Sequence, residues 1–102
     1  MLEIRPNCEL CDKDLAPDSA EACICTYECT FCADCVANLL RNVCPNCGGG
    51  FTPRPIRPRG EYRDGVGLEN HPPSQRRVHS VYGIEEIQRF SATLSDIAPE
   101  QR

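Results

Sequence analysis

A chain of 102 residues has room for one domain, and with no Trp, three Phe and three Tyr it offers few large apolar side chains for a conventional core. All nine Cys fall between Cys8 and Cys47, so the residues that organise the fold lie in that window. Residues 1–50 carry three basic and eight acidic side chains, a net charge of −5, which is the wrong sign for binding nucleic-acid phosphates.

The cysteines could form disulfides in an oxidising compartment or bind metal in a reducing one. The N-terminal residues MLEIRPNCELC lack the cationic segment and apolar run of a secretory signal. No stretch approaches the roughly 18 apolar residues that a membrane span requires. An odd number of cysteines also fits a disulfide scaffold poorly. We therefore expect a cytoplasmic protein that does not contact membranes and whose thiolates bind metal.

The first predicted unit, residues 1–51, contains four closely spaced cysteine pairs. A Cys-x2-Cys turn directs two sulfurs toward one metal at about 2.3 Å, and two such pairs complete a tetrahedron. The sequence therefore predicts two zinc ions bound by eight thiolates: Cys8, Cys11, Cys25, Cys29, Cys32, Cys35, Cys44 and Cys47. Because thiolates fill all four positions on each metal, none is open for water or substrate, so we expect structural zinc and no enzymatic activity.

Short secondary-structure elements are predicted between these ligands. The alternation around Cys23 to Tyr27 favours a strand. Val36, Leu39, Leu40 and Val43 follow helical spacing and should pack on Phe31 and Ile24. Cys23 is the ninth cysteine; two residues before Cys25, it could compete as a ligand from the same side of a strand, but we expect a free thiol.

The second half of the chain divides into two predicted segments. Residues 52–82 are rich in Pro, Gly and Arg without periodicity, which predicts an extended or disordered linker. Residues 83–98 place apolar side chains at intervals of three or four, which predicts a short amphipathic helix. An isolated helix of this length is marginal in water, so we expect a partly helical, mobile tail; a helix docked on this chain or on a partner is the alternative.

The order of the eight ligands resembles that of RING fingers. Phe31 precedes the fifth ligand, and the segment Cys44–Cys47, CPNC, matches the closing pair. More closely, residues 1 to about 58 resemble domain of unknown function family 1272, through the segments MLEIRPNCELCDKDL, ECTFCADC and VCPNCGG. That family consists of small, mostly bacterial cysteine-rich proteins and implies no established activity.

The RING resemblance implies a small metal-stabilised α+β fold of the treble-clef type, with one short helix and a small hairpin, followed here by a mostly disordered tail. It also implies a cross-brace, in which Cys8, Cys11, Cys32 and Cys35 hold one metal and Cys25, Cys29, Cys44 and Cys47 hold the other. Spacing alone leaves open a sequential pairing, with Cys8, Cys11, Cys25 and Cys29 together.

We expect a zinc-binding, non-catalytic module that interacts with an unidentified protein partner as an adaptor. A ubiquitin-ligase-like RING domain is one alternative, because Leu10 and Pro45 match groove positions of that family, although Gly48 stands where active ligases carry a cationic residue. Nucleic-acid binding would use the basic linker residues Arg54, Arg57, Arg59 and Arg63. An iron–sulfur protein is a further alternative, but eight residues separate Cys35 from Cys44 where the ferredoxin motif has three.

Overall fold

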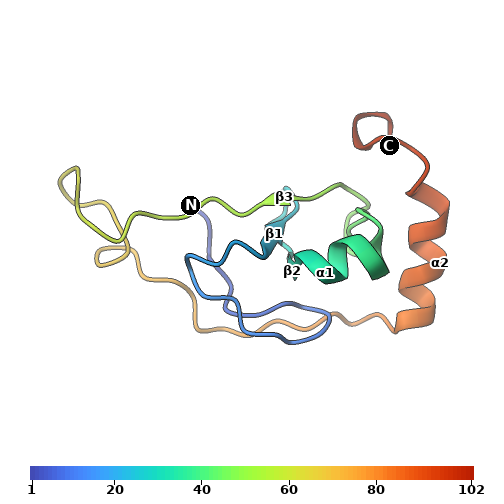
Figure 1. Cartoon of the computed structure of the whole chain (residues 1–102), viewed down its shortest axis with the longest axis horizontal. Coiled ribbons are helices and arrows are strands. Elements are labelled where there is room, and N and C mark those ends of the chain that lie inside the picture. The colour runs from blue at the N-terminus through green and yellow to red at the C-terminus, as the bar shows by residue number, and fades with distance from the viewer.

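A three-stranded antiparallel sheet lies at the centre of the cysteine-rich half (Figure 1). Strands β1 (Ala22–Ile24) and β2 (Thr30–Cys32) form a hairpin, and β3 (Thr52–Pro53) pairs with the other edge of β1, which gives the order β2-β1-β3. In the turn of the hairpin, the Glu28 N–H donates to the Cys25 carbonyl (3.0 Å). The computed structural model describes all 102 residues and measures 46 × 27 × 18 Å.

A short helical segment follows β2 directly. Helix α1 (Ala33–Cys35) runs into a wider π-helical turn, η1 (Val36–Leu40). Arg41 and Asn42 end it with left-handed backbone angles, φ 49° and φ 60°. The predicted helical face is therefore shorter than its spacing suggested, because Val43 lies beyond the last turn, although Val43 and Leu40 are both buried.

The core is small and built largely from sulfur. Of the eleven residues in the central buried cluster, six are cysteines, and the others include Phe31, Leu15 and Leu40. Phe31 packs edge to face against Phe51, with ring centroids 5.4 Å apart. A cluster of this size cannot offset the conformational entropy of a hundred residues by hydrophobic burial alone. The thiols must therefore contribute to stability by more than their packing.

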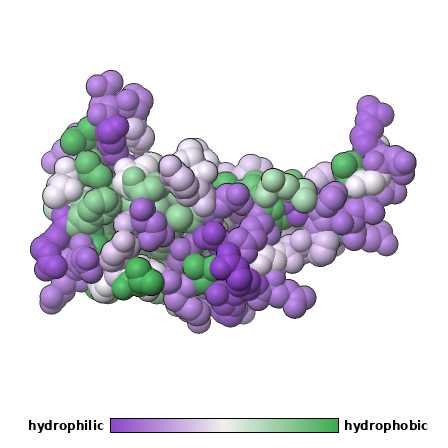
Figure 2. Space-filling model, turned by 180° about the vertical axis from the view of Figure 1, so that it is seen from behind, coloured by the Kyte–Doolittle hydropathy of each residue, from purple (hydrophilic) through white to green (hydrophobic).

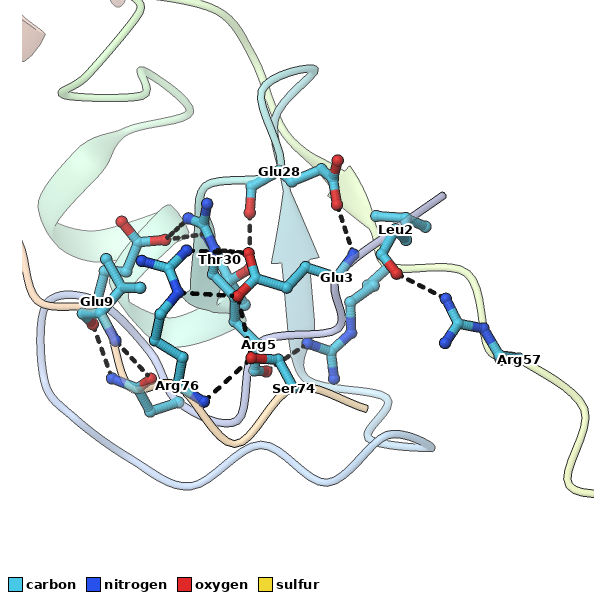
Figure 3. Close-up of polar contacts among 12 residues, drawn as sticks. Leu2, Glu3, Arg5, Glu9, Glu28, Thr30, Arg57, Ser74 and Arg76 are labelled. Carbon is cyan, nitrogen blue, oxygen red and sulfur yellow. Dashed lines mark hydrogen bonds and ion pairs between the residues drawn. The ribbon is translucent and has the colours of Figure 1, made fainter. Parts of the chain in front are cut away.

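Of the two alternatives for the linker, the disordered one is wrong, because residues 52–82 run as a largely extended segment with defined positions on the rest of the chain. The segment begins with β3, and its later part runs back beside the N-terminal residues (Figure 1). Arg57 donates to the carbonyls of His71 and Leu2, both at 2.6 Å, and Figure 3 shows the bond to Leu2. Composition predicted disorder because the segment has few apolar residues, but its arginines bind carbonyls and carboxylates of the acidic half.

The mobile C-terminal tail is likewise wrong. Helix α2 (Ile84–Leu94) lies within the predicted range and packs against η1, and a 3-10 turn, η2 (Pro99–Gln101), follows it. Ile87 is only 2% exposed and joins the core, and the buried Ser91 hydroxyl donates to the Leu40 carbonyl (2.7 Å). In Figure 2, hydrophobic residues gather toward the end of the molecule that carries α2. No helix combines the length and apolar character needed to cross a membrane.

Candidate metal centre

Four thiols meet at one end of β2: Cys8, Cys11, Cys32 and Cys35, whose sulfur atoms all lie within 4.8 Å of one another. The sulfurs of Cys11 and Cys32 are 3.7 Å apart. A tetrahedron with zinc–sulfur bonds of about 2.3 Å has edges of about 3.8 Å, whereas a disulfide bond measures about 2.05 Å. All nine cysteines are free thiols. The spacing and the all-sulfur donor set of this group therefore fit a zinc ion.

Two local structures bring these four thiols together. Cys8 and Cys11 lie in a tight turn, closed by a hydrogen bond from the Asp12 N–H to the Cys8 carbonyl (2.9 Å). Asp12 has φ 65°, a left-handed angle that Asp tolerates better than most residues. Cys32 is the last residue of β2 and Cys35 the last residue of α1, so the strand-to-helix junction holds both on one side.

A second group contains Cys25, Cys44 and Cys47, whose sulfurs also lie within 4.8 Å of one another. The turn after Cys44 closes with a hydrogen bond from the Gly48 N–H to the Cys44 carbonyl (2.7 Å), and Gly48 has φ +80°, which favours glycine. Backbone amides point at two of the sulfurs: Tyr27 donates to Cys25 (3.3 Å) and Gly49 to Cys47 (3.4 Å). Such donors orient and stabilise metal-bound thiolates.

Cys29 borders this second group. It is buried at the end of the β1–β2 turn, and its sulfur lies outside the 4.8 Å spacing of the other three. Burial raises the pKa of its thiol, the neighbouring Cys25 raises it further, and the Asn46 side chain lowers it. Cysteine spacing predicted nothing for Asn46, but its position inside the turn Cys44–Cys47 is a signal that could have indicated it. Cys29 is therefore the cysteine placed to supply the fourth sulfur of this group, and Asn46 is a neighbour that is not a ligand.

Burial makes four of these thiols hard to ionise without a cation. It raises the pKa of Cys35 and Cys44 far above that of an ordinary thiol, and neighbouring thiols add to the shift. Burial also raises the pKa of Cys29 and Cys32. At Cys11 burial acts in the same direction, but hydrogen bonds, first from the Lys13 backbone, lower the pKa overall. A divalent metal reverses this balance, because it stabilises the thiolates and releases their protons.

The two groups are interleaved along the chain. The first takes Cys8 and Cys11 from before the hairpin, Cys32 from its last residue and Cys35 from the helix that follows, while Cys25 of the second group lies between them in sequence. This is the grouping that the cross-brace implied, and the sequential pairing does not match it. Cys23 lies outside both groups; burial raises its pKa, and its thiol is 3.9 Å from the Glu21 carbonyl oxygen.

The residues that suggested other functions are largely engaged within the chain. Arg54 is buried and donates to the carbonyls of Arg5 and Ala16, and Arg59 pairs with Asp18 at 3.6 Å. Pro45 lines a cavity of about 520 Å³ together with residues of α2. A side chain at Gly48 would meet Leu94 of α2 at 3.1 Å. Helix α2 therefore stands beside both residues of the last cysteine turn that the RING comparison singled out.

Comparison with known proteins places the cysteine-rich half in a family. Residues 1–57 match the family described as "Protein of unknown function (DUF1272)". The chain is also 53% identical over 78 residues to an uncharacterised protein of Rhizobium meliloti (strain 1021), an alignment that covers 76% of this chain and 86% of the relative. No solved structure gives a significant match. The chain belongs to the DUF1272 family.

Proposed function

We propose that this protein is a non-catalytic interaction module whose fold is held by two structural zinc ions. One observation carries the proposal: two interleaved groups of thiols, the first with the sulfur spacing of a tetrahedral zinc site. Zinc suits an all-sulfur tetrahedral donor set. Cys29, Cys25, Cys44 and Cys47 would hold the second ion. Four thiolates per metal leave no position for substrate, so the metal supplies stability and no chemistry.

The energetic argument points the same way. Structural zinc contributes apparent binding free energies of about 10 to 16 kcal/mol in small zinc-finger peptides, as much as the whole net stability of an ordinary domain. A central cluster in which six of eleven residues are cysteines needs a contribution of that size. Because thiolates must stay reduced to bind zinc, we also infer that the protein works in a reducing compartment such as the cytoplasm.

The alternatives draw less support from the chain. Bound thiolates would take the charge of residues 1–50 from −5 to about −9, which opposes nucleic-acid binding. Arg54, Arg57 and Arg59 of the basic linker are already engaged by carbonyls or by Asp18. A ligase-like use of the last cysteine turn would have to accommodate α2 beside Pro45 and Gly48. An absorption spectrum distinguishes an iron–sulfur centre, which is coloured, from a zinc site, which is colourless.

Metal content and an absorption spectrum of the same sample, purified without added metal, test this proposal. The expected result is two zinc ions per chain and no visible absorbance. Removal of the metal by a chelator should unfold the protein, as followed by circular dichroism, and stoichiometric zinc should restore it. Iron with visible absorbance, or a folded protein that contains no metal, would overturn the proposal.

A further inference from the structure

The segment Ser74–Ser80, which we call the strap, runs parallel to the N-terminal segment Glu3–Glu9, which we call the edge (Figure 1). The Ser74 N–H donates to the Glu3 carbonyl (3.0 Å), and the Ser80 N–H donates to the Glu9 carbonyl (2.7 Å). Between these two bonds, Val78 pairs with Asn7, and in all three pairs the partners are 71 residues apart in sequence. The strap is therefore held in one register along the edge as an extended peptide.

Asn7 clamps the backbone of the strap. Its side chain is fully buried, and its amide group forms two hydrogen bonds with Val78: Nδ2 donates to the Val78 carbonyl (2.9 Å) and Oδ1 accepts from the Val78 N–H (3.3 Å). Further bonds from Nδ2 to the Cys8 carbonyl (3.2 Å) and to Asp12 Oδ1 (3.0 Å) fix the orientation of the amide. This clamp recognises an extended backbone whatever side chain the clamped residue carries.

Carboxylates on either side of the clamp bind the two adjacent arginines of the strap. Arg76 donates to Glu3 through Nε (3.2 Å) and Nη2 (3.1 Å), on the side drawn in Figure 3. Arg77 donates to Asp12 Oδ1 through Nη2 (2.8 Å) and to Asp14 through Nη1 (2.7 Å). Successive side chains of an extended peptide point in opposite directions, so two neighbouring arginines reach acids on opposite sides. Arg76 meets both oxygens of Glu3, and such two-point pairing of a guanidinium with a carboxylate makes recognition geometrically specific.

Apart from the bonds to the buried Asn7, the strap is held by contacts that water can reach. None of its residues is buried: Arg76, Arg77 and His79 are exposed, and Val78 is half-buried. Exposed ion pairs contribute little to stability and weaken with salt. Segments with few buried apolar contacts open locally without global unfolding. The edge, by contrast, is anchored through buried residues, including Asn7 and Cys8.

We propose that the edge is a recognition site for extended protein segments that carry two adjacent arginines, and that the strap is an internal copy of such a ligand. The strap occupies the site until a partner segment of the same chemistry displaces it. The acidic half of the chain, with its net charge of −5, attracts such a segment. This inference rests on the proposed interaction module and gives that module a partner of defined chemistry.

The test uses the full-length, zinc-loaded protein and a fluorescent peptide with the sequence of residues 73–81, PSQRRVHSV. The variant R76A/R77A weakens the strap and leaves every residue of the edge unchanged. Because a strap in the same chain competes at a high effective concentration, we expect this variant to bind the peptide at least about ten-fold more tightly than the wild type. Adding Asp14→Asn should remove the gain, and a peptide with both arginines replaced by Glu should not bind.

Hydrogen exchange at the amides of Val78 and Ser80 makes the test decisive. We expect these amides to be protected in the wild type and to lose protection in the double variant. Protection that persists in the variant, or an opened strap with no binding of the peptide, would overturn the inference. Native mass spectrometry of the same samples counts the zinc. Two ions without peptide binding refute the recognition site and leave the metal module intact, whereas a chain without zinc refutes the proposed function.

Discussion

Replacing Ile87 with Ala tests whether one buried side chain holds α2 on the metal-binding half. Ile87 is 2% exposed and is the one residue of α2 in the central cluster. Truncating a fully buried Ile to Ala costs about 2 to 5 kcal/mol. The hydrogen bond between Ser91 and the Leu40 carbonyl contributes about 1 kcal/mol, and an isolated helix of 11 residues is marginal in water. The loss is therefore larger than the Ser91 bond can offset, and α2 should open from η1 more often than in the wild type.

Hydrogen exchange followed by mass spectrometry of the zinc-loaded protein measures this effect. We expect the amides of α2 to lose protection in Ile87→Ala, while both metals remain bound. Ile84→Ala is the matched control, because it makes the same change in the same helix at a residue that is 45% exposed. Equal protection in the two variants would refute the anchoring role of Ile87. Loss of metal from Ile87→Ala would show that α2 is part of the metal-binding fold and not an addition to it.

Two further predictions follow from the site and from the acidic edge. Cys35→Ser should lose one metal ion and unfold much of the chain, because the bound metal contributes more to stability than the core does. Cys23→Ser should keep both ions and melt within a few degrees of the wild type, which corresponds to about 0.5 kcal/mol. Metal content and thermal melts check both variants, and metal loss from Cys23→Ser would mean that the ninth thiol is a ligand. A hydrogen bond from Arg76, with others from Ser74 and Arg5, holds the pKa of Glu3 below its usual 4.5. Above pH 4.5 the charged form of Glu3 therefore stabilises the fold, by at most about 1 kcal/mol. This contribution is lost as the pH falls through the lowered pKa. Glu3→Gln should therefore melt below the wild type at pH 7, with a gap that narrows below pH 4.5; a gap that widens on acidification would contradict the assignment.

The metal-binding groups of the cysteine-rich half could be predicted from the sequence because metal ligands follow a characteristic spacing. Four cysteine pairs in forty residues predicted two groups of sulfurs, and the structure gathers Cys8, Cys11, Cys32 and Cys35 into one of them. Spacing could not say which pairs share a group, since that depends on how the β1–β2 hairpin folds the chain back. The cross-brace came from resemblance alone.

The structure of the second half of the chain was harder to predict from the sequence, for a different reason. Its arginines and prolines indicate an unstructured linker when taken alone, because many of their partners are distant in sequence; Asp12, for example, lies 65 residues before Arg77. Periodicity located α2, but no local pattern indicated that Ile87 would enter the core beside the cysteines. Likewise, nothing near Asn7 in sequence predicted that its amide would clamp Val78. Long-range polar contacts leave little trace in local sequence.

The central claim, two metals held by interleaved thiols, is tested most directly by NMR of the protein loaded with ¹¹³Cd in place of zinc. Each cadmium couples through its sulfurs to the β-protons of the cysteines that bind it, so the spectrum identifies the ligands of each ion. We expect two cadmium resonances, one coupled to Cys8, Cys11, Cys32 and Cys35 and the other to Cys25, Cys29, Cys44 and Cys47. A single resonance, or one coupled to Cys8, Cys11, Cys25 and Cys29, would contradict the account.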